Sequence, residues 1–393
     1  MKEINTEKIQ VKLWLEDIED GAMEQIKNIA NLPFVYKWVA VMPDSHQGYG
    51  MPIGGVVALA DVISPNMVGV DIGCGMCVVN THIKTEDITQ EQLKETLGGI
   101  RKVVPVGFAH HQKKQEESLM PFSNSKSANG VVVAQEYDNA LTQIGTLGGG
   151  NHFIELQRSS EGELWIMIHS GSRNLGKQVC DYYNAKAIEL AKKWYIPNVV
   201  EQDLAYLPTD TKEGQDYIQE MQYCVDFAFA NRKLMMERVM GVVADTLGDY
   251  KAEEIINIAH NYARLENHMG RNVWVHRKGA TSARLGEVGI IPGSMGTKSY
   301  ITEGLGNVQS FMSCSHGAGR KMGRMEASRN ITLEEADKSM EGVVYGRWGK
   351  DRKGNLDFGE APQAYKDIDV VMENQKDLTK ILVELKPLAV VKG

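Results

Sequence analysis

Apolar residues in the second half of the chain recur at helical spacing over a long stretch. Between residues 215 and 247 they stand three, four and seven positions apart, as at Ile218, Met221 and Val225. The pattern stops at Gly248, a residue that commonly follows the last turn of a helix. It therefore predicts one long amphipathic helix, whose methionines and aromatic residues are typical of a core face.

Three further segments are predicted to be helical from the signals at their ends. Two of them open with the spacing of a capping box, Thr89 with Gln92 and Thr332 with Glu335. The first of these segments is expected to end before Pro105, and the segment without a capping box at Pro197, because proline cannot continue a helix. The segments are residues 89–104, residues 176–197 and the stretch that begins at Thr332.

Short β-branched runs lie between these helices and are predicted to be strands that lead into glycine-rich polar loops. The runs are residues 54–63, 77–83, 153–156, 164–171 and 271–279. The polar stretch 111–130 is instead predicted to be a mobile surface excursion. Glycine-rich polar segments occur from the start of the chain to its end, so we expect one folded body whose loops converge on a single cleft.

Composition narrows the class of protein. Hydrophobic residues make up 42% and charged residues 24% of the 393 positions, as in an ordinary globular protein. The net charge of −8 argues against nucleic-acid binding through bulk positive charge, so bound phosphates would need local Arg, Lys and backbone N–H groups. Five irregularly spaced cysteines do not indicate a disulfide framework and fit a reducing compartment.

The start of the chain carries charges throughout and has no apolar segment of the kind found in signal peptides. No apolar run reaches the length of about 18 residues that a membrane-spanning helix needs. We therefore expect a cytoplasmic protein without membrane association.

Several glycine-rich loops carry side chains that bind metals. The candidates are Asp71, Cys74, His152, His169 and His260. One carboxylate, one thiolate and three imidazoles suit Mn²⁺, Zn²⁺ or Fe²⁺ better than Mg²⁺ or Ca²⁺. Five donors exceed the three protein ligands of a typical catalytic zinc site, and a Cys74 thiolate shared by two ions would use them all. Spacing alone leaves alternatives open, since Cys74 and Cys77 could form a redox pair and each histidine could be structural.

Two loops have the composition of oxyanion-binding loops. Residues 293–298 (GSMGTK) offer backbone N–H groups, hydroxyls and a lysine, without the spacing of a Walker loop. Arg173 stands near two serines at the expected start of a helix, whose dipole favours an anion. His316, in SHGAGR, could be a turn histidine beside a solvated basic edge. Next to metal ligands and phosphate loops it could instead be the nucleophile of a phosphoryl or nucleotidyl transfer.

The series of motifs along the chain resembles that of the RtcB-type RNA ligases, the GTP-dependent 3′-phosphate/5′-hydroxyl ligases of the tRNA-splicing family. The motifs occur in the family's order from PDSHQGYGMPIGG to the terminal VVKG and cover nearly the whole chain. Between these two lie DIGCGM, GGGNHFIE, HSGSRNLG, HNYA, HRKGA, PGSMGTKSY, CSHGAGR and EAPQAYKDID. The resemblance implies a single-domain α+β fold over residues 1–393, with β-sheets flanked by helices around a polar cleft that holds two Mn²⁺ ions.

The resemblance also implies a role for each matching residue. His316 would be guanylylated, with Asp44 beside the metals and Arg173 on phosphate as further catalytic residues. The implied metal ligands are Asp71, Cys74 as the bridge, His152, His169 and His260. The implied nucleotide contacts are Asn151, Glu155, Ser294, Gly317, Ala318, Gly319, Arg320, Tyr365 and Lys392. Among these contacts, Glu155 would recognise guanine.

The implied reaction joins an RNA 3′-phosphate or 2′,3′-cyclic phosphate end to a 5′-hydroxyl end, in tRNA splicing or RNA repair. A cyclic phosphate would first be opened, and His316 would then take GMP from GTP. The GMP would pass to the RNA 3′-phosphate, giving RNA-(3′)pp(5′)G, and the 5′-hydroxyl would displace it. RNA and GTP are thus the expected partners, together with an archease-type activator, and the expected state is a monomer.

Two other classes of function stay open at this point. A dinuclear metal phosphodiesterase or phosphatase acting on RNA ends would need no GTP and no nucleophilic histidine. A non-catalytic RNA-binding scaffold would not depend on metal. For the RNA ligase, the acidic net charge implies that RNA binds to a local basic patch, expected at Arg173, Arg277, Lys278, Arg320 and Arg324. We expect Cys77 in the core, His46 at the substrate and His110 and His111 at the surface, and we assign neither His268 nor His276 to metal.

Overall fold

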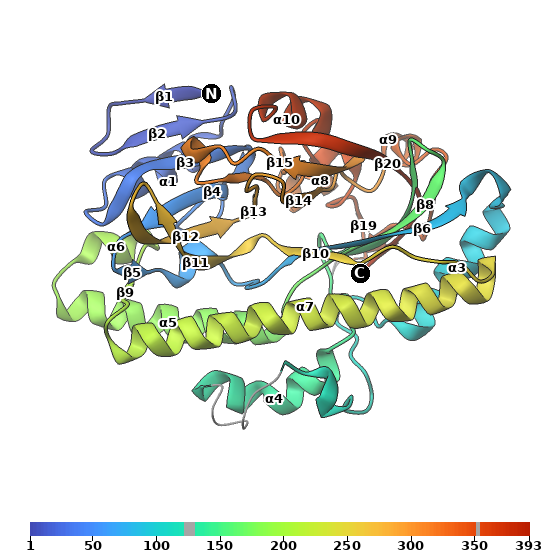
Figure 1. Cartoon of the computed structure of the whole chain (residues 1–393), viewed down its shortest axis with the longest axis horizontal. Coiled ribbons are helices and arrows are strands. Elements are labelled where there is room, and N and C mark those ends of the chain that lie inside the picture. The colour runs from blue at the N-terminus through green and yellow to red at the C-terminus, as the bar shows by residue number, and fades with distance from the viewer. Residues whose placement is uncertain (122–129, 351–353) are drawn as a thin grey trace.

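The computed structural model describes residues 1–121, 130–350 and 354–393 and combines helices with antiparallel sheets (Figure 1). This arrangement confirms the predicted α+β class. In the described part of the chain, no helix combines the length and the hydropathy that crossing a bilayer requires.

The first sheet has six strands in the order β1-β2-β3-β4-β12-β11. Its pairs are antiparallel except for β2 and β3, which run parallel. The strands are β1 (Lys2–Ile4), β2 (Gln10–Leu13), β3 (Val35–His46), β4 (Ile53–Leu59), β12 (Arg271–Lys278) and β11 (Asn261–His268). Helix α1 (Asp20–Ala30) supplies the crossover between β2 and β3, and its buried isoleucines pack on the sheet.

The second sheet follows the antiparallel order β10-β6-β8-β7-β20-β15-β14, with β17 parallel to β20. Its strands are β10 (Ile256–Ala259), β6 (Gly75–Lys84), β8 (Glu163–Ser170), β7 (Phe153–Ser159), β20 (Thr379–Lys392), β15 (Ser299–Gly304), β14 (Val288–Ile291) and β17 (Val344–Tyr345). Short ladders pair β13 (Ala280–Ser282) with β16 (Ser313–Ser315), β5 (Val62–Ile63) with β9 (Leu207–Pro208), and β18 (Gly349–Lys350) with β19 (Leu356–Asp357).

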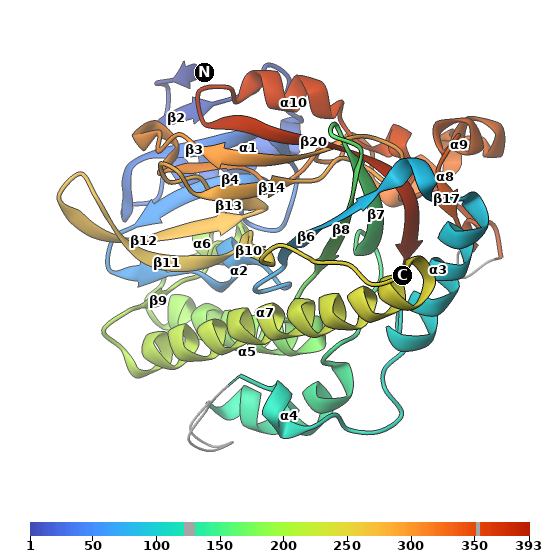
Figure 2. The same ribbon diagram turned by 45° about the vertical axis from the view of Figure 1, so that its right-hand side comes forward.

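Helices α7 (Lys212–Leu247) and α5 (Arg173–Lys193) lie side by side beneath the sheets, with α4 (Val131–Gln143) outside them (Figures 1 and 2). One face of α7 packs against the second sheet, where Met235 and Val239 share an apolar cluster with Ile168 of β8. The other helices are α2 (Pro65–Val68), α3 (Gln90–Val103), α6 (Pro197–Glu201), α8 (Arg324–Asn330), α9 (Leu333–Ser339) and α10 (Ile368–Asn374). Single 3-10 turns occupy Thr85–Asp87, Glu117–Leu119, Val308–Ser310 and Pro362–Ala364.

Most elements predicted from the sequence are confirmed, with small errors at their ends. The long helix extends from Lys212 to Leu247, and both capping boxes are present, at Thr89 and at Thr332. The segment predicted to end at Pro197 ends at Lys193, because Tyr195 takes a left-handed conformation at φ 56°. Of the predicted excursion 111–130, residues 122–129 lie outside the described residues, and α4 follows directly after it.

Candidate metal centre and active site

One edge of the second sheet brings together the strand ends that carry the predicted metal ligands. β10, β6, β8 and β7 are antiparallel neighbours in that order. The end of β10, the start of β6, the end of β8 and the start of β7 therefore meet at the same edge. Cys74 directly precedes β6, and His152 directly precedes β7. His260 directly follows β10, and His169 is the last residue but one of β8.

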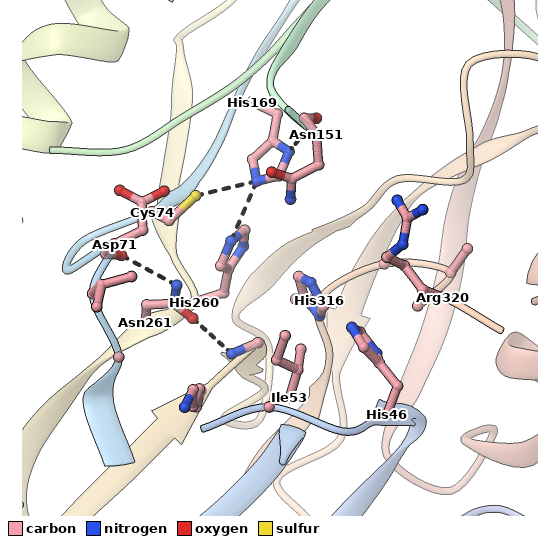
Figure 3. A pocket seen from close by; sticks show the side chains of 18 of the residues that line it. His46, Ile53, Asp71, Cys74, Asn151, His169, His260, Asn261, His316 and Arg320 are labelled. Atoms are coloured by element: carbon pink, nitrogen blue, oxygen red, sulfur yellow. Dashed lines mark hydrogen bonds between the residues drawn. The ribbon is translucent and has the colours of Figure 1, made fainter. Parts of the chain in front are cut away.

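The ligand atoms at this edge have the mutual distances expected around a divalent ion (Figure 3). Cys74 Sγ lies 3.4 Å from His152 Nε2 and 3.3 Å from His169 Nε2. The Nε2 atoms of His169 and His260 are 3.4 Å apart. Ligands held about 2.0–2.3 Å from one ion are separated by about such distances. The donor set therefore fits a metal ion, and the Cys74 sulfur is close enough to two imidazoles to be shared.

The far sides of two of the three imidazoles, those of His152 and His169, are arranged as in known metal sites. His152 Nδ1 donates to the Leu147 carbonyl at 2.9 Å, and His169 Nδ1 donates to the Asn151 carbonyl at 3.2 Å. These bonds fix the tautomer with its lone pair on Nε2, the nitrogen that faces the cluster. Burial lowers the pKa of both His169 and His260 well below the usual range, so both rings are neutral and able to bind a cation.

Cys74 and Asp71 contribute the negative charge of the cluster. Burial, followed by the charge of Asp71, raises the pKa of Cys74 well above its usual value, so its thiolate needs a cation nearby. Asp71 Oδ2 lies 3.1 Å from His152 Nε2, with the Asp71 side chain 31% exposed. Burial acts to raise the pKa of Asp71, but the interaction with the His152 side chain and the charge of Arg173 prevail, and the pKa is lowered.

Arg173 is fixed beside the cluster at the start of α5. Its backbone is left-handed at φ 60°, a conformation that is uncommon outside glycine. Its guanidinium donates to Thr146 Oγ1 at 3.1 Å and to the Gly107 carbonyl at 3.3 Å. The strained backbone and these bonds hold a cation near the carboxylate of Asp71, whose pKa it helps to lower.

His316 faces the cluster from the two-stranded ladder that β13 forms with β16. It follows β16, and its ring centroid lies 4.7 Å from that of His260 (Figure 3). Asp44, near the end of β3 and fully buried, accepts hydrogen bonds at Oδ2 from His316 Nδ1 at 2.6 Å and from the His316 backbone N–H at 3.1 Å. Nε2 is thus the ring nitrogen that is left free to react. That Asp44 lies beside the metals stays a prediction; its hydrogen bonds to His316 are those of a group that orients the histidine.

A pocket of about 670 Å³ joins the metal cluster to His316. Most of the expected nucleotide contacts line it, namely Asn151, Ser294, Gly317, Ala318, Gly319, Arg320, Tyr365 and Lys392. Gly319 has φ 71°, and a Cβ at this position would lie 2.1 Å from the Asp44 carbonyl oxygen, so the turn after His316 requires glycine. Lys298, offered by the sequence as part of a phosphate loop, instead pairs with Asp369 at 3.3 Å.

The far wall of the pocket holds several cations around one carboxylate. Glu360 accepts from Arg320 and Lys392, each at 3.2 Å, and from Arg324 at 2.8 Å. Burial opposes ionisation of this carboxyl, but the charges of Lys392, Arg324 and Arg320 outweigh it and lower the pKa of Glu360 to about 2. Tyr365 also donates to Glu360. Three cations share one anion here, which leaves positive charge for a phosphate.

Comparison with known proteins agrees with this geometry. The family model described as tRNA-splicing ligase RtcB matches residues 25–393. The RNA-splicing ligase RtcB of Escherichia coli K12 is 39% identical over 414 aligned positions, covering 99% of each chain. The chain belongs to the RtcB family. The tRNA-splicing ligases RtcB of Methanococcus maripaludis and Pyrobaculum aerophilum are 34% and 32% identical, covering 97% and 98% of this chain and 93% and 95% of their own.

Glu155 of this RtcB family member is buried beside the residues that line the pocket. It shares a face of β7 with Phe153, which lines the pocket, because alternate residues of a strand point the same way. Its carboxylate accepts from Gln157 Nε2 at 2.6 Å. Burial, only partly offset by the charge of Lys392, raises the pKa of Glu155 to about 7.

The predicted basic patch is wrong at one position. Arg277 is fully buried, and it binds Glu266 at 2.6 Å and the Phe311 carbonyl at 3.0 Å, so it cannot contact RNA. The apolar residues on the same face of its strand could have indicated this, since Val273 and Val275 are buried as well. Lys278 does line the pocket, but its ammonium is occupied by the carbonyls of Tyr49 and Asn66.

Other residues at the site carried little signal in the sequence. Glu360 was not assigned any role, although it is part of the motif that contains Tyr365. Asn261, directly after His260, donates to the Asp71 carbonyl at 3.1 Å and accepts from the Gly279 N–H at 2.7 Å (Figure 3). Its position next to a candidate ligand and its place in the HNYA motif are signals that could have found it. Cys77 is buried as expected, His110 is exposed, and His111 is half-buried against Arg238.

Proposed function

We propose that this protein is an RNA ligase that uses GTP and Mn²⁺ to join RNA 3′-phosphate or 2′,3′-cyclic phosphate ends to 5′-hydroxyl ends. Membership of the RtcB family supports the ligase reaction and RNA as the substrate. The observation that carries the proposal is the pair formed by His316 and Asp44, placed between a metal-binding cluster and a cationic pocket wall.

His316 is the proposed nucleophile, reacting through Nε2. Asp44 holds the proton on Nδ1, so the lone pair of Nε2 points away from the carboxylate. The bond from Nε2 to the α-phosphorus of GTP forms as the bond to pyrophosphate breaks. As the ring gains positive charge in this step, the buried Asp44 carboxylate stabilises it. Asp44 is thus proposed to position and stabilise the nucleophile.

Two Mn²⁺ ions would be held by the side chains of Asp71, Cys74, His152, His169 and His260, and the Cys74 thiolate, close to two of the imidazoles, would serve both ions. Bound ions would neutralise charge on the transferred phosphate and on the RNA 3′ end. Arg173, fixed at the edge of the cluster, is proposed to bind a phosphate oxygen.

The nucleotide is proposed to lie along the pocket between Asn151 and the cationic wall. Arg320 and Lys392 would share their charge between Glu360 and the phosphates or the base. Ser294 and the 317–319 turn would contact the nucleotide closely, since the turn has no side chain larger than that of alanine. Glu155, in its ionised form, would accept hydrogen bonds from guanine, and Tyr365 would flank it.

After guanylylation the chain would complete ligation in two transfers. The RNA 3′-phosphate oxygen attacks the α-phosphorus, and the bond to His316 Nε2 breaks. The 5′-hydroxyl oxygen then attacks the RNA 3′-phosphorus, releasing GMP and restoring a phosphodiester. The nitrogen of His316 is regenerated between the two transfers, still oriented by Asp44.

The test is a ligation assay with defined ends. Two short RNAs, one ending in a 3′-phosphate and one beginning with a 5′-hydroxyl, are incubated with GTP and Mn²⁺. We expect a joined product with GTP but not with ATP, and none when the acceptor carries a 5′-phosphate. We expect no product from His316→Gln. Hydrolysis of the RNA end without joining, unchanged in His316→Gln, would refute the ligase proposal in favour of a metal phosphodiesterase.

A further inference from the structure

Two consecutive polar residues interrupt the buried face of α7 directly behind the metal cluster. Asn231 and Arg232 are fully buried, on a helix whose neighbouring buried positions, such as Phe227, Met235 and Met236, are apolar. Figures 1 and 2 show α7 passing beneath the second sheet. In that sheet, β8 contains His169, and Cys74 directly precedes β6. A buried arginine is rare unless its hydrogen bonds have a structural use.

Arg232 binds the backbone on both sides of the cluster. Its Nη1 donates to the Gly73 carbonyl at 2.8 Å and to the Ser170 carbonyl at 2.9 Å. Gly73 directly precedes Cys74, and Ser170 directly follows His169. One nitrogen therefore ties together the two strand ends whose ligand atoms, Cys74 Sγ and His169 Nε2, lie 3.3 Å apart. Its Nε donates at 2.7 Å to Asn257, three residues before His260.

Asn231 binds the remaining loops. Its Oδ1 accepts from the N–H groups of Gly145 and Thr146 at 2.7 Å and 3.2 Å, and its Nδ2 donates to the Gly171 carbonyl at 3.1 Å. The loop that begins at Gly145 contains Leu147, whose carbonyl accepts from His152 Nδ1 at 2.9 Å. Ser170 Oγ donates to the same carbonyl at 2.7 Å and accepts from Asn231 Nδ2 at 3.3 Å.

The buried charge of Arg232 makes this arrangement costly. Among the described residues its hydrogen bonds go to neutral oxygens, and its Nη2 has no partner. Burial lowers the pKa of Arg232 to about 10, partly offset by the charges of Cys77, Cys74 and Asp71. An apolar residue of similar size would avoid this desolvation, as it does at neighbouring positions of the helix. A cation is therefore expected to have a use here beyond packing α7 against the sheet.

We propose that Asn231 and Arg232 are positioning residues for the metal centre, holding the four ligand-bearing strand ends in binding geometry before any ion arrives. This inference rests on the metal centre of the proposed function. It predicts that a substitution that removes these hydrogen bonds weakens metal binding much more than a substitution elsewhere in α7 that lowers the stability of the fold equally. Loss of hydrogen-bonding groups behind metal ligands typically weakens binding about 10- to 100-fold.

The experiment measures Co²⁺ binding to the full-length protein by optical titration, since a Cys74 thiolate bound to Co²⁺ gives a charge-transfer band. The variants are Arg232→Met and Arg232→Lys. Met keeps the bulk without donors. Lys keeps the charge but has a single nitrogen, so it cannot bind the carbonyls of Gly73 and Ser170 as Nη1 does and Asn257 as Nε does at the same time. Met236→Ala is the control for stability, because Met236 is buried one turn further along α7 in an apolar cluster. Lys233→Met, on the exposed face, controls for the loss of a charge.

We expect Co²⁺ affinity to fall at least about tenfold in Arg232→Met and in Arg232→Lys, with an altered band. We expect wild-type affinity in Met236→Ala, although its melting temperature falls, and in Lys233→Met. Wild-type Co²⁺ affinity and spectrum in Arg232→Lys would overturn the inference. An equal loss of Co²⁺ affinity in Met236→Ala would overturn it as well. If Arg232→Met does not fold, the result for Arg232→Lys decides. A wild-type protein without the thiolate band would instead refute the metal centre itself.

Discussion

Replacing Asp44 by asparagine tests how His316 is activated. Both hydrogen bonds from His316, from Nδ1 at 2.6 Å and from the backbone N–H at 3.1 Å, reach the same oxygen of Asp44. An asparagine carbonyl in that place keeps the tautomer but removes the charge. A hydrogen bond to a charged group is worth about 1–2 kcal/mol more than a neutral one. Since each 1.36 kcal/mol is a factor of ten, we expect guanylylation to slow about 5- to 30-fold.

The same substitution has a separate effect on stability. Oδ1 of Asp44 is buried and has no hydrogen-bond partner among the described residues. The amide NH₂ of the introduced asparagine would take its place, and burying that donor unpaired costs about 1–3 kcal/mol. Asp44→Asn is therefore expected to lower the melting temperature as well as the rate.

The assay is a single-turnover reaction with α-labelled GTP and Mn²⁺, quenched and resolved on a denaturing gel at a temperature where the variant is folded. Co²⁺ affinity serves as the control, because the hydrogen bonds of Asp44 go to His316 and not to the cluster. Labelling at the wild-type rate would refute the argument. A loss of Co²⁺ affinity in proportion to the rate would show that Asp44 acts through the metals.

Three further predictions concern other parts of the site. Burial raises the pKa of Glu155 to about 7, and Glu155 must be ionised to bind guanine, so GTP affinity should increase about tenfold between about pH 6 and pH 8. Calorimetry should find no such pH dependence in Glu155→Gln, and a flat profile in the wild-type protein would contradict the role. Cys74→Ser should abolish the thiolate band and weaken Co²⁺ binding at least about tenfold; an unchanged titration would exclude Cys74 as a ligand. Arg277→Met should destabilise the fold by about 3 kcal/mol in urea unfolding, since the buried Glu266 carboxylate loses a partner; the loss is no larger because Glu266 keeps Arg284 at 2.9 Å. RNA affinity should be unchanged, and the opposite pattern would restore Arg277 to the RNA patch.

The sequence predicted the elements of the fold better than their assembly. The periodicity of α7 and the capping boxes at Thr89 and Thr332 are local signals, and the structure confirms them. Local signals could not reveal that β10, β6, β8 and β7 are neighbours, since strand order depends on long-range packing. They also placed a helix end at Pro197, whereas the left-handed Tyr195 ends the helix earlier.

The candidate site was predictable where residue chemistry is distinctive. Cysteine and histidine in glycine-rich loops indicated metal binding, and strand order then explained why Cys74 and His169 meet. Supporting residues were harder to predict, because an asparagine or arginine within a helix has many ordinary uses. Neither Arg232 nor Glu360 stood out before the structure showed which groups each one binds.

The central claim is that His316 carries GMP, and mapping the covalent adduct tests it most directly. The protein is incubated with GTP and Mn²⁺ without RNA, digested under alkaline conditions that preserve phosphoramidates, and analysed by mass spectrometry. We predict one guanylyl group, on the peptide that contains His316, and none in His316→Gln. Wild-type protein without an adduct, or an adduct on another residue that persists in His316→Gln, would contradict the account.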